Sequence, residues 1–266
     1  MNTLVLSLSA LAALVPATLL PFVRHAARAD AVFWVLLGAA LAGATMLSTV
    51  SLAARWQTEL STTLWLAVAV SLAIFALVAL WQREAARLAP LLLPYLLILG
   101  VLATGFGPWT GPEPLAAAPD GWLVVHIAVS VATYGLCTIA AVASAAVFVQ
   151  ERALKRRSPN AFTRMLPSVA DAERLEVRLL AASEVVLGIG IATGISELYV
   201  TSGAFFTVSH KTLLSVLAFL VIGVLLLLHY RSGLRGRRAA RLVLVAYLLL
   251  TLAYPGVKFV TDVLLG

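Results

Sequence analysis

Charged residues are scarce in this sequence and make up only 12% of its 266 residues. Soluble domains carry about 25% charged residues, so water is not the main solvent of this chain. Hydrophobic residues make up 62% of the chain, and the mean hydropathy is +1.01. The composition predicts an integral membrane protein, and the length fits a single membrane domain covering residues 1–266.

Cysteine is nearly absent as well. Cys137 is the only one, which excludes an internal disulfide and a CxxC redox pair. The four histidines form no HxxH or HExxH motif, so the sequence has no compact metal-binding signature. There is no internal repeat and no low-complexity tract. Functional residues must therefore be sought singly, on the predicted helices.

Long apolar runs fill most of the chain. A helix needs about 20 apolar residues to cross a hydrocarbon core about 30 Å thick, with its backbone hydrogen bonds satisfied internally. Eight runs meet this requirement, at residues 3–22, 32–53, 61–81, 89–106, 121–149, 176–196, 209–230 and 239–264. We therefore expect an all-α fold, a polytopic bundle of eight transmembrane helices. No basic residue precedes the first run, which argues against a cleavable signal peptide.

The basic residues predict the orientation of the bundle. Only Arg55, Lys211 and Lys258 lie in or beside the even-numbered connections and the chain ends, and the other 16 of the 19 basic residues follow spans 1, 3, 5 and 7. The positive-inside rule then places these four connections in the cytoplasm and both termini on the outer side. The net charge of +7 is thus mainly a topology signal, and we expect no nucleic-acid partner.

The connection after span 5 reads ERALKRRSPNAFTRMLPSVADAERLEVRLL and is strongly basic. Ser168 has the character of a helix N-cap, with Asp171 three residues later, and Leu175, Leu179 and Leu180 follow. This pattern predicts a surface helix that leads into span 6 and contacts acidic membrane lipids.

Two histidines lie at the predicted outer ends of their helices. His126 and His210 open spans 5 and 7 at similar depth, and both stand near helix N-termini. Neutral imidazole binds iron, copper or zinc, while helix N-termini favour anions. Lys211 follows His210 directly. Haem would use all three features, with both histidines on the iron and Lys211 near the propionates. The alternative is a pair of interfacial histidines hydrogen-bonded to water or lipid headgroups.

Ser130 and Tyr134 follow His126 at steps of four residues. They therefore lie along nearly the same helix face, and a polar stripe on an apolar helix should turn toward the bundle interior. One interpretation is that both side chains orient the imidazole or line a cavity below it. The other is that they form hydrogen bonds between helices.

Two segments of the second half resemble a known family. They are WLVVHIAVSVATYGLCTIAAVASAAVFVQERALK, with its histidine, serine and tyrosine, and the segment from SHKTLLSVL to AYPGVKFV, with its GLRGRRAA turn. Together, over roughly residues 121–264, they resemble the cytochrome c assembly proteins of the CcsA, CcmC and HemX type, most of all the YpjD branch. The first four spans agree in number and hydrophobicity.

The resemblance implies a protein of the bacterial inner membrane that handles haem at its outer face, between two histidines. His126 matches the first of these histidines, and His210 is a displaced match for the second. Haem-delivering relatives carry a Trp-rich segment before span 7, where this chain reads ISELYVTSGAFFTVSHK without tryptophan. We therefore expect a haem-binding or accessory protein that works with other cytochrome assembly proteins, rather than a synthase.

Two other functions stay open at the level of sequence. One is a membrane transporter, or a partner of one, with Glu184 and the polar stripe of span 5 along a solute path. The other is a scaffold that assembles membrane proteins through the basic inner connection. Gly188, Gly190 and Gly194 of span 6 are predicted to permit close helix packing in either case.

Overall fold

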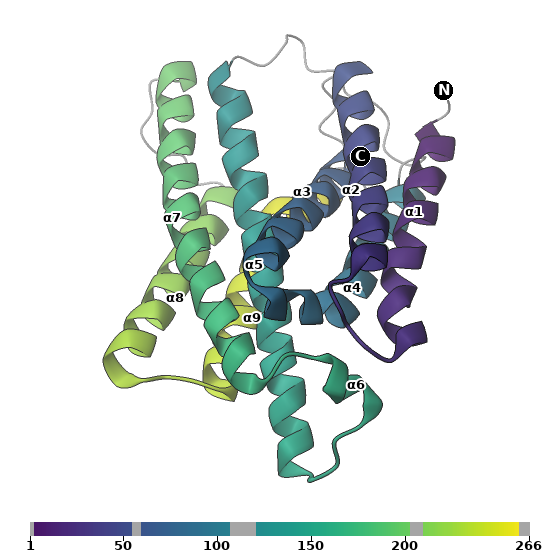
Figure 1. Cartoon of the computed structure of the whole chain (residues 1–266). Helices are drawn as coiled ribbons and strands as arrows, with labels where there is room; N and C mark the ends of the chain where they lie inside the picture. The colour runs from purple at the N-terminus through teal and green to yellow at the C-terminus, as the bar shows by residue number, and fades with distance from the viewer. Residues whose placement is uncertain (1–2, 55–59, 107–120, 203–209, 261–266) are drawn as a thin grey trace.

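The computed structural model describes residues 3–54, 60–106, 121–202 and 210–260. All regular structure in these ranges is helical (Figure 1). The first half comprises α1 (Thr3–Arg24), α2 (Ala31–Ala54), α3 (Leu60–Trp81), the short 3-10 helix η1 (Arg83–Leu88) and α4 (Ala89–Phe106). The second half comprises α5 (Gly121–Lys155), α6 (Ala161–Met165), α7 (Val169–Ser202), α8 (His210–Ser232), α9 (Arg237–Thr251), the π-helical turn η2 (Leu252–Gly256) and α10 (Val257–Phe259).

Eight helical segments are long and apolar enough to cross a membrane, which confirms the predicted number of spans. The fourth predicted span coincides with α4, whereas α5 continues beyond residue 149 to Lys155. The last span is interrupted at Pro255, where the π-helical turn accommodates a residue without a backbone N–H. Residues 261–264 of that span, the connection 107–120 and residues 203–209 lie outside the described ranges.

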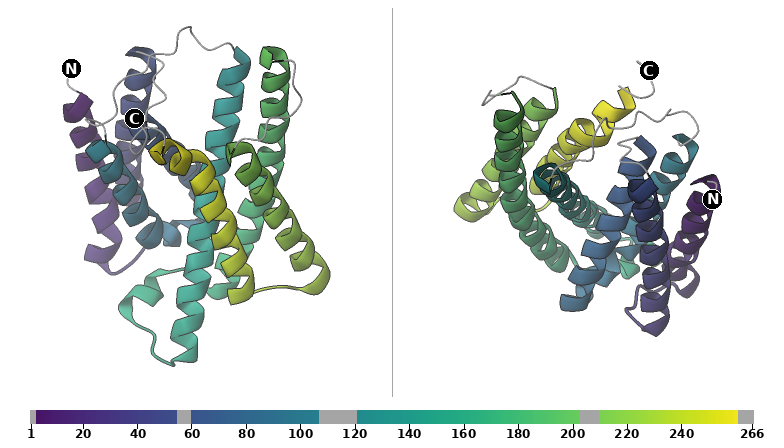
Figure 2. Two further views of the ribbon diagram at one scale, coloured as in Figure 1. Left: turned by 180° about the vertical axis from the view of Figure 1, so that it is seen from behind. Right: turned by 90° about the horizontal axis from the view of Figure 1, so that it is seen from above.

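Helix α5 occupies the centre of the bundle (Figure 2). It packs most extensively on α7 and also contacts α9 and α3, so it joins the two halves. The α5 residues at these contacts are small, and Ala140, Ala143, Ser144 and Ala146 are all fully buried. Small side chains let helix backbones approach closely, which is how helices associate where lipid supplies no hydrophobic drive.

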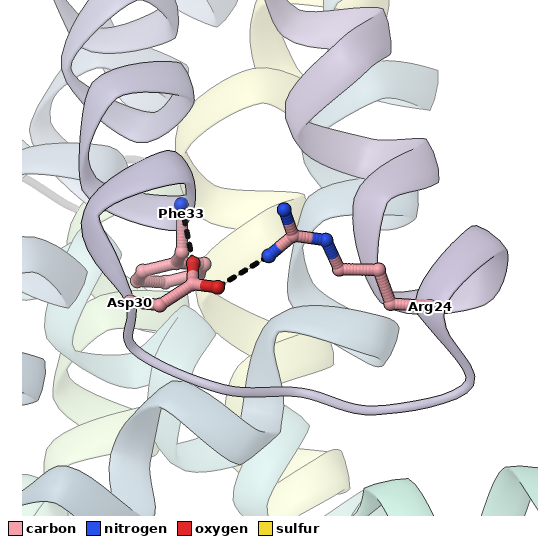
Figure 3. A network of polar contacts seen from close by, with 3 residues as sticks. All are labelled: Arg24, Asp30 and Phe33. Carbon is pink, nitrogen blue, oxygen red and sulfur yellow. Dashed lines mark hydrogen bonds and ion pairs between the residues drawn. The ribbon is translucent and has the colours of Figure 1, made fainter.

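The four basic connections lie toward the same end of the bundle, the lower end in Figure 1. At the first of them, Asp30 caps α2 by accepting a hydrogen bond from the Phe33 backbone N–H at 2.9 Å, and it also pairs with Arg24 (Figure 3). The cytoplasmic position of this end, and the outward position of both termini, stay predictions from the charge distribution.

Ser168 caps a helix as predicted, since its hydroxyl accepts a hydrogen bond from the Asp171 backbone N–H at 3.2 Å. The helix differs from the predicted surface helix because α7 runs without a break from Val169 into the span. Leu175, Leu179 and Leu180 are buried in the bundle core. The apolar stripe is therefore the inner part of a long transmembrane helix.

Candidate functional site

A pocket of about 360 Å³ opens among α5, α7, α8 and the π-helical turn. Its volume is in the range of small-molecule sites in proteins. Its polar lining comes from α5, α8 and the π-helical turn, and α7 supplies two glycines and apolar side chains. The polar lining residues are His126, Ser130, Thr133 and Tyr134 of α5, Lys211, Thr212 and Ser215 of α8, and Tyr254 of the π-helical turn.

His126 is held against α7 by a short chain of hydrogen bonds. Its Nδ1 lies 3.1 Å from the Thr193 hydroxyl oxygen, which in turn lies 3.0 Å from the Gly190 carbonyl oxygen. The carbonyl can only accept, so the Thr193 hydroxyl donates to Gly190 and accepts from Nδ1–H of His126. In the neutral form of this half-buried ring, Nδ1 therefore carries the proton and Nε2 keeps the lone pair that binds metals.

The small residues of α7 make this approach possible. A Cβ atom on Gly194 would lie 3.0 Å from Cε1 of His126, closer than side chains tolerate without moving. Trp122, one turn before His126, donates its indole N–H to the Thr193 carbonyl oxygen at 3.2 Å. Thr193 therefore fixes the position of both the start of α5 and the imidazole. The close packing predicted at the span 6 glycines leaves the space that the imidazole occupies.

Ser130 and Tyr134 line the same pocket below His126. The Ser130 hydroxyl donates to the His126 backbone carbonyl at 2.8 Å, so it contacts the helix backbone rather than the imidazole. The buried Tyr134 hydroxyl accepts from Tyr247 at 3.1 Å and lies 3.3 Å from that of Tyr95. Tyr134 thus combines both sequence interpretations, because it lines the cavity and also bonds to neighbouring helices.

The structure separates the two residues at the start of α8. Lys211 lines the pocket, whereas His210 is exposed and is not among the lining residues. The outer ends of α5 and α7 also extend beyond the start of α8 (Figures 1 and 2). Of the two predicted histidines, His126 is therefore the one that the structure places among the lining residues of the pocket.

Sequence reasoning missed Thr193, Tyr95 and Tyr247. Thr193 lies 67 positions from His126, and no local pattern links the two residues. The only sequence signal was indirect, because Gly190 and Gly194 flank Thr193 and indicate a close helix contact there. Tyr95 and Tyr247 come from α4 and α9, so their meeting with Tyr134 depends on tertiary packing.

Within the described residues, no three His, Cys, Asp or Glu side chains gather where they could hold a bare metal ion. The fold and the pocket together define a class of protein: a polytopic membrane bundle with one imidazole in a pocket at the end opposite the basic connections. Comparisons with known proteins place it within that class.

The family described as Cytochrome C assembly protein matches residues 32–265. A 28.8 kDa protein from the nifR3-like 5′ region of Azospirillum brasilense is 53% identical over 269 residues, covering 100% of this chain and 99% of that protein. The inner membrane protein YpjD of Escherichia coli is 30% identical over 179 residues, covering 66% of this chain and 65% of YpjD. No solved structure matches the chain.

This chain belongs to the cytochrome c assembly protein family. It is a multi-pass protein of the bacterial inner membrane. The resemblance seen in the sequence, including that to YpjD, is confirmed. The family match also begins at residue 32, so it includes the second to fourth helices, for which the sequence alone offered only their number and hydrophobicity.

Proposed function

We propose that this chain is a haem-handling protein of cytochrome c assembly. Haem binds in the pocket at the end predicted to face outward, with His126 and His210 as iron ligands. The observation that carries the proposal is the hydrogen bond between Nδ1 of His126 and Thr193, because it engages Nδ1 and leaves the lone pair of Nε2 available to a metal. Histidines that bind metals nearly always donate their other ring N–H to a fixed acceptor.

The pocket residues fit the chemistry of haem. Imidazole donors suit a cofactor that would bring the other ligands of its metal with it, and the described residues offer no cluster for a bare metal. Leu187, Ile191 and Leu250 give the pocket apolar walls, as a porphyrin plane requires. Lys211 and the first turn of α8 provide positive charge and backbone N–H groups for carboxylates. Bound haem would supply a redox-active iron.

His210 is the direct sequence neighbour of a residue that lines the pocket. Lys211 lines the pocket, and His210 precedes it at the first residue of α8. We propose that His210 would be the second histidine to hold the haem, in keeping with the two-histidine arrangement that the family resemblance implies. Thr193 acts as a positioning residue for His126, and Ser130 and Tyr134 form the pocket wall below the ring.

The absorption spectrum of the detergent-purified chain tests the proposal. We expect a Soret band with sharp peaks after reduction, either as purified or after haemin is added. His126→Ala should lose most of this absorbance, and His210→Ala should change the reduced peaks because one of the two histidines that would hold the haem is removed. His229→Ala is the matched control, since His229 lies at the other end of α8 and bonds to the Leu234 carbonyl at 3.0 Å. Absence of haem uptake by the wild type would refute the proposal.

A transport function is the second candidate, and one observation favours it. Glu184 lies in the middle of α7, and its Oε2 is buried without a hydrogen-bond partner among the described residues. Carboxyl groups within membrane helices often mark ion or proton paths. Solute or ion flux in proteoliposomes that falls in Glu184→Gln and does not respond to haemin would favour transport over haem handling.

A further inference from the structure

A second cavity, of about 440 Å³, lies on another side of the bundle between α3 and α7. Both helices pack on α5, and α5 forms the floor of the groove between them. The walls are nearly all apolar, and the main contributors are Ile74, Leu77 and Val78 of α3, Leu136 of α5, and Leu175 and Leu179 of α7. The groove shares no lining residue with the His126 pocket.

The groove opens to the surface of the bundle. Leu77 is 55% exposed and Trp81 is 86% exposed, and Ala182 is exposed on the opposite wall. In a membrane-spanning bundle such a surface faces lipid. An apolar groove there is filled by hydrocarbon chains, because an empty groove loses dispersion contacts and water gains no polar partners.

Polar groups line the groove only toward the end with the basic connections. Gln82 follows the last residue of α3, and Arg178 stands on the facing wall. Side chains on a helix tilt toward its N-terminus, so Arg178 of α7 leans toward the end at which α7 begins. Trp81 beside them has the character of an interfacial aromatic anchor.

Arg178 differs from the neighbouring arginine one turn earlier. Arg174 pairs with Asp171 at 4.0 Å, whereas Arg178 makes no ion pair within the described part of the chain. A guanidinium group without a carboxylate, at the edge of an apolar groove, is complementary to a phosphate with an attached hydrocarbon chain. The cytoplasmic leaflet, where this end is predicted to lie, carries anionic lipids.

We propose that the groove between α3 and α7 binds one anionic phospholipid. An acyl chain lies along Leu77, Leu136 and Leu179, and the phosphate is bound by Arg178 with the Gln82 amide as a second donor. This site is independent of haem binding. It gives α3 and α7, which meet mainly through α5, a shared ligand that links the two halves of the bundle.

Native mass spectrometry of the delipidated full-length chain tests this site. The probes are phosphatidylglycerol and phosphatidylcholine with identical acyl chains, each added over a range of concentrations. We expect one phosphatidylglycerol to be retained in preference to phosphatidylcholine. Arg178→Gln should weaken its retention about fivefold, the effect of one basic side chain at an anionic surface. Arg174→Gln is the matched control and should leave retention unchanged.

A second variant tests the apolar part of the site without disturbing the core. Ala182 is exposed at the rim, so Ala182→Phe should fold and should occupy the space of the acyl chain, lowering retention of both lipids. Equal retention of the two lipids by the wild type, or equal losses in Arg178→Gln and Arg174→Gln, would overturn the proposal. Haem absorbance should be unchanged in all three variants, and lipid retention should be unchanged in His126→Ala, so the two proposals can fail separately.

Discussion

Polar side chains of α1 and α2 are used differently from those around the pocket. In α1 and α2, the hydroxyls of Thr18, Thr45 and Ser48 each donate to the carbonyl one turn earlier on their own helix. In the second half, His126 bonds across to Thr193, and Thr138 bonds across to Tyr247. A hydroxyl that bonds to its own helix specifies no partner, whereas a bond between helices fixes both. Specific geometry is therefore concentrated around the pocket in the second half, with Tyr95 of α4 reaching it through Tyr134.

The helices of the first half are stabilised mainly by the packing of apolar side chains. Leu72 and Phe75 of α3 and Leu92, Leu93 and Leu96 of α4 are fully buried in one apolar cluster. Within a membrane, such packing stabilises helices through dispersion contacts, since lipid is as apolar as leucine. The two halves should accordingly respond differently to mutation, the first in stability and the second in haem retention.

The largest expected effect is the loss of stability in Phe75→Ala. The Phe75 ring is 0% exposed and packs edge-on against Phe33, with 6.4 Å between centroids. Removing it should cost about 3 kcal/mol, at the low end for a buried ring because lipid-exposed helices lose packing rather than hydrophobic transfer. Thermal unfolding in detergent measures this loss, and Phe75→Leu should recover most of it.

Haem bound per folded molecule should stay unchanged in Phe75→Ala. A fall in haem retention without a fall in unfolding temperature would contradict the expectation that substitutions in the first half change stability and those in the second half change haem retention.

The second effect concerns Thr193→Val, which keeps the side-chain volume and removes the acceptor for Nδ1 of His126. Residues that orient a metal-binding histidine typically contribute about 10- to 100-fold to affinity, and we expect a loss of haem affinity in this range. Haemin titration followed by absorbance measures it. Thr193→Ser restores the hydroxyl and should rescue binding, a result that a purely structural role for Thr193 would not produce.

A smaller effect is expected from a matched pair of glycine substitutions. Gly194→Ala places a Cβ atom 3.0 Å from Cε1 of His126, so the ring must shift, and haem affinity should fall severalfold. A Cβ atom at Gly105 of α4 meets no described residue within 4 Å, so Gly105→Ala should leave haem affinity unchanged. Equal effects of the two substitutions would show that helix propensity, rather than the position of the imidazole, is being measured.

The sequence was sufficient for the number of membrane spans because hydrophobic length is a local property. The apolar run at 89–106 coincides with α4, and Ser168 caps α7 as predicted. The extension of α7 inward to Val169 was missed because a leucine stripe looks the same on a surface helix and on the buried inner part of a span. Periodicity identifies an apolar face but not what that face contacts.

The candidate site could be predicted only in part. Imidazole chemistry singled out His126, and the step of four residues placed Ser130 and Tyr134 on its face. The contact with Thr193 depends on the register between α5 and α7, which no local pattern encodes. The exposure of His210 likewise depends on tertiary packing, which no local pattern encodes.

The smallest expected effect is the contribution of the Asp30 charge to stability, at the connection between α1 and α2. The backbone N–H of Phe33, and then Arg24, hold the pKa of Asp30 below its ordinary value because both stabilise the carboxylate. A lowered pKa in the folded state means that this contribution is present above the ordinary carboxyl pKa and is lost as the pH falls through the folded value. Both partners are exposed, so the contribution is small and should shrink further in salt.

Asp30→Asn isolates the charge, because asparagine caps a helix about as well as aspartate does. Unfolding temperatures measured across the acidic range should fall for the wild type, and the Asp30→Asn variant should lack this component of the decline. Asp30 lies in the first half of the bundle and far along the chain from the pocket residues. Haem retention should therefore not change in the variant. Identical pH profiles of the two proteins would mean that the Arg24–Asp30 pair and the cap contribute nothing as charges, and that the first half depends on packing alone.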